Sequence, residues 1–150
     1  MGTLRLEELN AGNIVAANTL TLKPGQEQFV APVSHSIAEA YVNPTTAWPR
    51  VVLEDDEVAG FIMANFDPDA DQEEFRSCIW RINVAAHAQG HGVGTFAVRA
   101  LADEARDRGF RRLTVIYETG DEGPEAFFSH VGFRQFRETR YGEAIAALDL

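Results

Sequence analysis

Residues 89–94 have the sequence Gln-Gly-His-Gly-Val-Gly, in which three glycines alternate with other residues. A predicted strand over 75–84 precedes this stretch, and a predicted helix follows it. Alternating glycines let the backbone turn tightly and approach a ligand closely. The first amides of a helix have no partner inside the helix, so they can bind an anion. The stretch therefore predicts a phosphate-binding turn, with a plain tight turn as the alternative.

Two well-known phosphate-binding loops do not fit this spacing. A P-loop ends in Gly-Lys-Ser or Gly-Lys-Thr, whereas Gly94 is followed by Thr95 and Phe96. A dinucleotide-binding turn needs glycine or alanine where Thr95 stands, and it usually opens the first βαβ unit. Here predicted strands and helices already precede the turn. Both readings are therefore excluded.

The stretch after the turn has the pattern of an amphipathic helix. Its apolar residues recur at helical spacing: Val93, Phe96, Ala97, Ala100, Leu101 and Ala105. Charged residues fall on the opposite face, and a glycine at position 109 stands where a helix commonly ends. Further along, the sequence predicts a strand over 113–117, a short helix over 124–130, and a pair of strands over 133–139 and 143–150.

The residues before the turn predict short helices and a run of strands. An acidic turn over 55–57 joins two of these strands as a hairpin. Helices, then a meander of strands, then alternating strands and helices indicate an α+β fold, which we expect to form a single domain over residues 1–150. The expected strands cover 3–7, 50–54, 58–66 and 75–84, and the expected helices cover 10–18, 27–31 and 34–42.

Composition and charge argue against several classes of protein. The 150 residues carry 23 acidic and 13 basic side chains, a net charge of −10, which argues against a general nucleic-acid binder. A single cysteine, Cys78, rules out an internal disulfide and fits a reducing compartment. No apolar run reaches the ~18 residues of a membrane span, and the N-terminus lacks a signal core. We therefore expect a cytoplasmic protein that binds neither nucleic acid nor membrane.

Several motifs together resemble one enzyme superfamily. Residues 89–94 fit the pattern Gln/Arg-x-x-Gly-x-Gly/Ala, which is typical of the GNAT superfamily of acetyl-CoA-dependent N-acetyltransferases. The bacterial diamine and polyamine N-acetyltransferase branch is similar over roughly Gln26 to Leu150. The similar stretches are Gln-Phe-Val-Ala-Pro at 28–32, Ser-Ile-Ala-Glu-Ala-Tyr at 36–41, Ile-Trp-Arg at 79–81, Gly-Pro-Glu-Ala-Phe-Phe at 123–128, Gly-Phe at 132–133 and Gly-Glu at 142–143.

This resemblance implies a fold and a co-substrate. The implied fold is a mixed, mostly antiparallel sheet of six to seven strands with about four helices on its faces, splayed between the fourth and fifth strands. Acetyl-CoA would enter that gap, with its pyrophosphate on the turn and its pantetheine arm along strand groups that lack partners. The implied contacts are Ile82, Asn83, Val84, Gln89, Gly90, His91, Gly92, Val93, Gly94, Thr95, Pro124, Phe127 and Phe128.

The catalytic groups depart from the superfamily pattern. Acetyl transfer to an amine needs a deprotonated nitrogen, a stabilised thioester oxygen and a donor for the leaving thiolate. In the superfamily that donor is often a tyrosine where this chain has Phe128, which cannot donate. By position, Tyr117 is the nearest substitute donor, with Glu118 as a proton relay. Alternatively, Tyr117 is an aromatic residue packed on one face of its strand, and Glu118 is a solvated residue at the strand end. Direct attack requires no nucleophilic residue, so Cys78 is expected in the core. It stands where histone-acetylating relatives carry a carboxylate base.

The acceptor amine is expected to meet Glu39, Tyr41 and Trp80. Glu39 and Tyr41 lie in a segment that often shapes the acceptor pocket in this superfamily, and Trp80 either lines that pocket or fills core. Acidic loops over 55–57 and 67–74 would concentrate a cationic amine, or they are ordinary solvated surface.

No metal is expected. His87 and His91 have the spacing of metal ligands on a helix. They straddle glycines in a loop, and no cysteine or carboxylate completes a ligand set.

The residues and the resemblance together predict an acetyl-CoA-dependent N-acetyltransferase, an acyltransferase in which a small primary amine attacks the thioester directly. A polyamine is the first choice of acceptor. One alternative is a different acceptor, such as an amino acid, a drug or a protein amine. Another is a non-catalytic acyl-CoA-binding module, which Phe128 favours. A homodimer is compatible with the resemblance.

Overall fold

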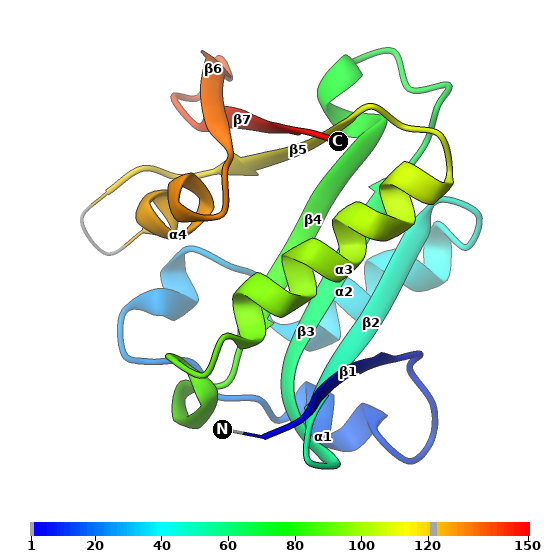
Figure 1. The fold of residues 1–150 in the computed structure, drawn as a ribbon, viewed down its shortest axis with the longest axis vertical. Coiled ribbons are helices and arrows are strands. Elements are labelled where there is room, and N and C mark those ends of the chain that lie inside the picture. Colours follow the sequence, from blue (N-terminus) through cyan, green and yellow to red (C-terminus); the bar gives the residue numbers. More distant parts are fainter. Residues whose placement is uncertain (1, 121–122) are drawn as a thin grey trace.

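The computed structural model describes residues 2–120 and 123–150, and these form a seven-stranded sheet (Figure 1). The strands lie in the order β1-β2-β3-β4-β5-β7-β6. The β4–β5 pair is parallel, and the other neighbours are antiparallel. The strands are β1 (Leu4–Glu7), β2 (Ala47–Glu54), β3 (Glu57–Phe66), β4 (Ser77–Val84), β5 (Arg112–Tyr117), β6 (Arg134–Glu138) and β7 (Ala144–Asp149).

β4 and β5 pair at only one end. Their register contains two residue pairs, Cys78 with Thr114 and Ile79 with Val115. Beyond these pairs the two strands diverge (Figure 1). β4 stays paired with β3 as far as Val84, so its other edge faces no strand from Trp80 onward. The sheet therefore opens between its two halves.

β4 also bulges at the point where it leaves β5. The β3–β4 register shifts so that Met63 faces Arg81 while the next residue, Ala64, faces Ile79. Trp80 is thus the additional residue on β4. A bulge bends the strand that carries it and increases its local twist. The bulge accordingly coincides with the start of the opening.

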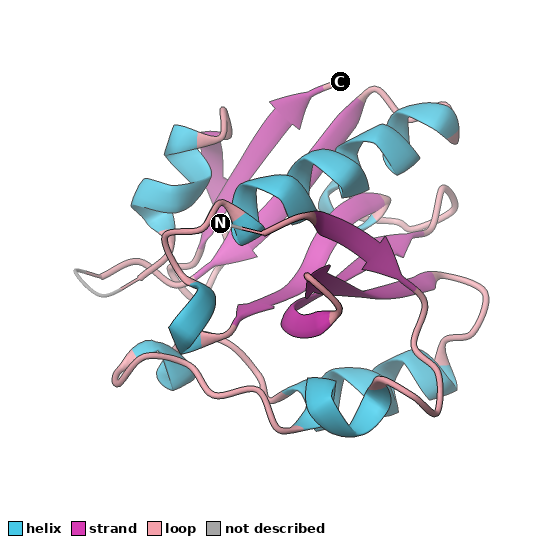
Figure 2. Ribbon diagram, turned by 60° about the horizontal axis from the view of Figure 1, so that its bottom comes forward, coloured by secondary structure: helices cyan, strands magenta, loops and turns pink. Residues whose placement is uncertain are grey.

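Helices cover both faces of the sheet (Figure 2). α3 (Val93–Asp107) lies on one face of the N-terminal strands, whereas α1 (Ile14–Asn18) and α2 (Val33–Val42) lie on the other. α4 (Glu125–His130) lies beside β5 and β7 (Figure 1). No helix within the described ranges is both long and apolar enough to cross a membrane.

The core has two parts because successive strand residues point to opposite faces. On β3, Ile62 belongs to the larger cluster, which includes α3 and α4 residues, while Phe61 and Met63 belong to a smaller cluster with residues of α1 and α2. α3 contributes a fully buried Leu101 to the larger cluster. After α3, Gly109 takes a positive φ of 91°, the conformation that commonly ends a helix.

The α+β class, the seven strands, the splay between the fourth and fifth strands and four α-helices among the described residues confirm the expected fold. The helix expected over 27–31 is wrong, because this segment forms only a short 3₁₀ helix, Gln26–Gln28, before Pro32 precedes α2. The strand expected from Phe75 begins at Ser77, since Glu73–Phe75 form another 3₁₀ helix.

Candidate active site

A cleft of about 890 Å³ lies in the opening between β4 and β5. Pockets of this size hold small ligands and cofactors. One side consists of β4, the glycine turn and the first turn of α3; the other consists of the end of β5 and the start of α4. The lining residues come from the segments 26–32, 79–84, 88–95, 115–118 and 123–128, together with Leu22 and Glu143.

The glycine turn has the conformation that its sequence predicts. Gly90 and Gly92 have positive φ values of 87° and 80°, and an added Cβ at either position would meet nothing within 4 Å. These glycines are therefore needed for their conformation and leave space beside the backbone. The first bond of α3 runs from the Phe96 amide to the Gly92 carbonyl. The amides of residues 93–95 thus have no helical partner, and all three residues line the cleft.

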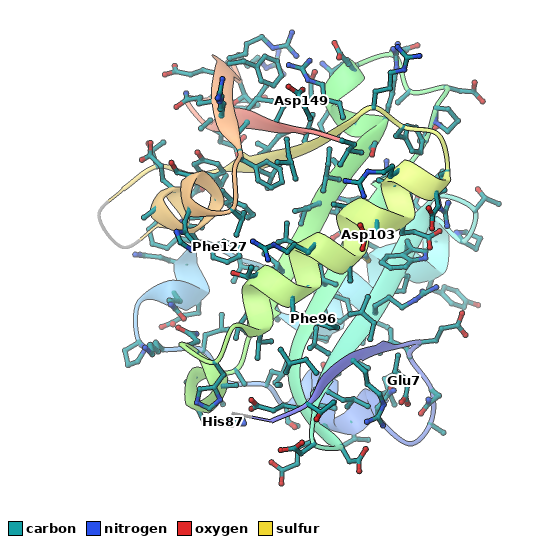
Figure 3. All side chains as sticks on the ribbon, in the orientation of Figure 1. Glu7, His87, Phe96, Asp103, Phe127 and Asp149 are labelled. Atoms are coloured by element: carbon teal, nitrogen blue, oxygen red, sulfur yellow. The ribbon has the colours of Figure 1, made fainter. Side chains whose placement is uncertain are left out.

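The third glycine of the turn is needed for space. A Cβ added to Gly94 would lie 3.0 Å from two ring atoms of Phe127. Phe127 extends from α4 toward the N-terminal half of α3 (Figure 3). Gly94 therefore lets α4 approach α3, and Phe127 and Gly94 together line the cleft.

The edge of β4 is only partly free. Ile82 and Val84, both predicted as acetyl-CoA contacts, line the cleft. The Val84 carbonyl, however, accepts a hydrogen bond from the Gln89 side chain at 2.9 Å. Asn83 is buried, and its side-chain amide donates to the Ala31 carbonyl at 3.1 Å. The carbonyl of Val84 and the side-chain NH₂ group of Asn83 are therefore engaged within the protein, whereas the buried Oδ1 of Asn83 has no partner among the described residues.

Gln89 connects the turn to the segment in front of the cleft. Its amide exchanges two hydrogen bonds with the amide of Gln26, at 2.7 and 3.0 Å. Together with the bond to Val84, these contacts hold residues 26–32 next to β4. The sequence motif contains Gln89, but nothing in the pattern pointed to Gln26 as its partner.

His91 faces away from the cleft. Its Nδ1 lies 3.1 Å from Oε1 of Glu54, at the end of β2. The hydrogen bond with His91, followed by one from the Gly2 amide, lowers the pKa of the Glu54 carboxyl. His87 lies on the 3₁₀ helix before the turn, far from Phe127 (Figure 3). No group of three metal-binding side chains occurs among the residues described.

Tyr117 lines the cleft and stacks on Phe128. The two rings are 5.4 Å apart at 17°, and Phe128 is 2% exposed. Burial, and secondarily the charge of Glu125, raises the pKa of the Tyr117 phenol. The phenol of Tyr117 therefore keeps its proton at neutral pH. Glu118 follows it at the exposed end of β5 and also lines the cleft.

Cys78 is unsuited to covalent catalysis. It is buried at the closed end of the β4–β5 opening. Desolvation raises the pKa of its thiol to about 12. Because the thiolate is the reactive form of cysteine, Cys78 is inert at neutral pH.

The residues predicted for the acceptor separate into two groups. Trp80 lines the cleft beside Arg81. Glu39 does not line it but forms an ion pair with Arg81 at 2.8 Å, so it acts on the cleft through that side chain. Tyr41 is 85% exposed on α2 and does not reach the cleft. Arg81 was not predicted as a site residue, although it follows Trp80 directly.

A scan against protein families identifies the chain. The model of the acetyltransferase (GNAT) family matches residues 18–133. The chain belongs to the GNAT family. No curated protein matches it by sequence.

Solved structures of low sequence identity share this GNAT fold. An acetyltransferase from Thermus thermophilus superposes with a TM-score of 0.78 at 19% identity, over 100% of both chains. The ribosomal-protein-S18-alanine N-acetyltransferase from Escherichia coli has a TM-score of 0.70 at 18% identity, over 98% of this chain and 94% of its own. N-acetylglutamate synthase from Neisseria gonorrhoeae, solved with coenzyme A and N-acetyl-glutamate, has a TM-score of 0.72 at 18% identity, over 100% of this chain and 36% of its own.

Family membership confirms the enzyme class and the co-substrate that the sequence predicted. The chain is an acetyltransferase of the GNAT family, which uses acetyl-CoA. The cleft suits that co-substrate, because free amides and two open glycines stand at one end and an apolar wall runs along β4. Family membership by itself specifies no acceptor amine.

Proposed function

We propose that this GNAT-family chain transfers the acetyl group of acetyl-CoA to a primary amine of a small polyamine. The observation that carries the proposal is the cleft between β4 and β5, which has phosphate-binding geometry at one end and Tyr117 at the other. A ligand that spans both ends would place its thioester beside Tyr117 and Trp80.

The phosphates would bind at the glycine turn. The amides of Val93, Gly94 and Thr95 would donate to the pyrophosphate, supported by the positive end of the α3 dipole. The pantetheine arm would lie along Ile82 and the β4 backbone. Pro124, Phe127 and Phe128 would cover it from α4.

Transfer would then proceed by direct attack. The neutral amine nitrogen forms a bond to the acetyl carbon, and the carbon–sulfur bond breaks. Backbone amides of β4 would polarise the carbonyl oxygen. Tyr117 would donate its proton to the leaving thiolate, which gives the free thiol. The nitrogen would lose a proton to solvent, and the phenolate of Tyr117 would regain a proton from solvent. Glu118 would relay that proton at the exposed end of β5.

The charge of the chain supports a cationic acceptor. With a net charge of −10, its negative potential raises the local concentration of polyamines. Acidic residues also lie close to the cleft, since Glu118 and Glu143 line it directly. A polyamine presents primary amines together with the positive charge that such a surface attracts.

The test is thiol release from acetyl-CoA with spermidine, spermine and a mixed pool of other amines. The rate should rise from about pH 7 to about pH 9, because more of the amine is then neutral. The buried Cys78 should contribute little background to a thiol reagent. Turnover with spermidine above that with the other amines is the expected result. Turnover only with an amino acid or a drug-like amine would replace the polyamine.

A second candidate function is a non-catalytic acyl-CoA-binding domain. Phe128 favours it, because phenylalanine stands where relatives often carry a tyrosine donor, and its ring is buried beneath Tyr117. Tight acetyl-CoA binding without turnover on any amine would support this candidate and contradict the enzyme assignment.

A further inference from the structure

The backbone groups of β4 alternate between its two edges, so the register identifies those that face the cleft. The Ala85 amide donates to the Ala59 carbonyl at 2.8 Å, and the register with β3 continues without a shift back to Arg81. Antiparallel pairs alternate between bonded and non-bonded positions, so the Arg81 amide points toward β3, like that of Ala85. The peptide bond between Trp80 and Arg81 is trans. The Trp80 carbonyl therefore points the opposite way, toward the cleft.

Arg81 covers this carbonyl with its own side chain. Its Nη1 donates to the Trp80 carbonyl at 2.7 Å, and its Nη2 donates to Oε1 of Glu39 at 2.8 Å. The guanidinium carbon lies 5.8 Å from the centre of the Trp80 ring, within the range of a cation–π contact. Both Arg81 and Trp80 line the cleft. One guanidinium thus connects the bulge of β4 to α2.

The third donor group of Arg81 indicates that this arrangement is not optimised for stability alone. Nε of Arg81 is buried and forms no hydrogen bond with the described residues. A buried donor without a partner costs free energy, and for this reason most buried polar groups in proteins are paired. Exceptions to such rules are expected at functional sites. The side chain of Arg81 therefore keeps a costly position next to the cleft.

The cap on the Trp80 carbonyl matters because of the charge that develops during acetyl transfer. When the amine nitrogen attacks, the acetyl oxygen acquires negative charge. A carbonyl oxygen with free lone pairs on the same edge of β4 would repel that charge. The guanidinium of Arg81 occupies the lone pairs of the Trp80 carbonyl and places a positive charge there instead. This edge lies beside the position proposed for the thioester.

We propose that Arg81, anchored by Glu39, is a positioning residue for acetyl transfer: it fixes the bulged peptide of β4 and shields the acetyl oxygen from the Trp80 carbonyl. The inference rests on the proposed function and deepens it, because it assigns a role in the transfer step to two residues besides Tyr117 and Glu118. Glu39 holds the guanidinium in place and acts through Arg81.

The test uses three variants at the bulge. Arg81→Gln removes the guanidinium, and Glu39→Gln removes the charge of the anchor but keeps an oxygen that accepts from Arg81. The double variant Glu39→Gln with Arg81→Gln leaves no unpaired charge, so it remains informative if the single Arg81 variant is unstable. Circular dichroism verifies that each variant is folded.

Arg50→Gln is the matched control, because Arg50 makes the same kinds of contact away from the cleft. It donates to the carbonyl of the preceding residue, Pro49, at 2.7 Å, and it pairs with Glu8 at 3.5 Å. Its guanidinium carbon lies 4.1 Å from the centre of the Trp48 ring. Arg50 is not among the residues that line the cleft.

Three measurements separate a role in transfer from a structural role. Kinetics give kcat and KM with an amine that the unmodified protein acetylates, and calorimetry gives the acetyl-CoA Kd. Infrared spectroscopy gives the stretching frequency of the thioester carbonyl in bound acetyl-CoA labelled with ¹³C at that carbon. The frequency falls as the carbonyl becomes more polarised, and its measurement requires no acceptor.

We expect Arg81→Gln to lower kcat by about tenfold or more, which is less than the ~100-fold loss for a direct donor to the oxyanion. The acetyl-CoA Kd should stay within about twofold, because the lost contact acts on charge that develops during transfer. The carbonyl stretch should move to higher frequency than in the unmodified protein. Arg50→Gln should leave all three measurements unchanged.

The double variant tests whether Glu39 acts through Arg81. Glu39→Gln alone should lower kcat by a smaller factor than Arg81→Gln, and the double variant should be no slower than Arg81→Gln alone. Additive losses in the double variant would contradict the anchoring role of Glu39. A kcat and a carbonyl stretch that match those of Arg50→Gln in both Arg81 variants would overturn the inference.

The two proposals can fail separately. Acetylation of spermidine at an unaltered kcat in both Arg81 variants would leave the proposed function standing and overturn the inference. A carbonyl stretch that depends on Arg81 in a protein that does not acetylate spermidine would support the role of Arg81 at the thioester and reject the polyamine. Absence of acetyl-CoA binding in the unmodified protein would overturn both.

Discussion

Tyr117 and Phe128 show at the residue scale how a side chain's role depends on its neighbours. Each ring is buried, and the two stack on each other, yet only Tyr117 carries a hydroxyl. Sequence comparison with a family pattern directs attention to position 128, where the donor is missing. The folded chain brings another phenol to the same cleft from β5.

We expect Tyr117→Phe to lower kcat by about 100-fold, the usual lower bound for losing a general acid, while the acetyl-CoA Kd stays unchanged. The Tyr117 pKa is raised, so the phenol remains protonated through neutral pH and ionises only above its ordinary value. The unmodified enzyme should therefore lose activity at high alkaline pH, and the variant should lack this limb of the pH profile. An unchanged kcat in the variant would assign proton donation to solvent.

Gly92→Val should abolish measurable acetyl-CoA binding. Gly92 has a φ of 80°, and its side-chain position is open toward the ligand, so a branched side chain would both strain the turn and block the phosphates. Gly109→Val is a matched control, because Gly109 has a φ of 91° and equally open surroundings at the far end of α3. Each variant should lose about 1–2 kcal/mol of stability from the left-handed backbone.

Calorimetric titration with acetyl-CoA distinguishes the two glycine variants. Binding should be lost at position 92 and retained at position 109. Normal affinity in a folded Gly92→Val protein would show that the turn does not hold the phosphates.

α3 links the core to the candidate site at the scale of elements. Its buried side fixes it against β3 and β4, and that packing holds its first amides at the cleft. Most helical stability in proteins comes from such tertiary packing. The core beneath α3 therefore anchors the helix whose first amides we propose to bind the phosphates.

Leu101→Ala should lower the free energy of unfolding by about 2–5 kcal/mol. Leu101 is 0% exposed in the middle of α3, so truncation leaves a cavity in the larger core cluster. Urea unfolding monitored by circular dichroism gives the value, and Arg99→Ala on the exposed side of the same helix is the control. A loss below about 1 kcal/mol would mean that the core collapses around the site.

The hydrogen bond between Glu54 and His91 acts at the scale of the whole molecule, because it joins the end of β2 to the turn before α3, 37 residues away in sequence. The hydrogen bond with His91 lowers the pKa of Glu54 below its ordinary 4.5. A carboxyl whose pKa is lowered by folding stabilises the fold above its unfolded-state pKa, and this contribution is lost as pH falls through the folded-state pKa.

Glu54→Gln should accordingly reduce stability above pH 4.5, and its effect should fade as pH falls through the lowered pKa of the folded state, where the carboxyl of the unmodified protein becomes protonated. Urea midpoints measured across this range test the prediction, with the exposed Glu57→Gln as the control. Midpoints of Glu54→Gln that match the unmodified protein at neutral pH would show that the pair does not contribute to stability.

The local sequence pattern was sufficient to predict the α+β class, the amphipathic helix α3 and the positive-φ glycines of the turn. These features depend on neighbouring residues, through helical periodicity and the steric limits of the backbone, so they can be predicted from one sequence. The prediction of a helix over 27–31 was wrong because the conformation of this segment depends on residues that are distant in the sequence. That segment is held by Gln26 contacting Gln89, 63 residues away, and by the Asn83 bond to Ala31.

The folded chain alone decided which side chains face the cleft. The sequence predicted both Tyr41 and Trp80 as aromatic residues that contact the acceptor. In the folded chain, Trp80 lies at the bulge of β4 and lines the opening, whereas Tyr41 is exposed to solvent on α2. Glu143 lines the cleft because the strand order places β7 next to β5 and the β6–β7 turn beside the β4–β5 opening. Contacts between residues distant in the chain are set by the packing of whole elements, and for that reason they leave no local signal in the sequence.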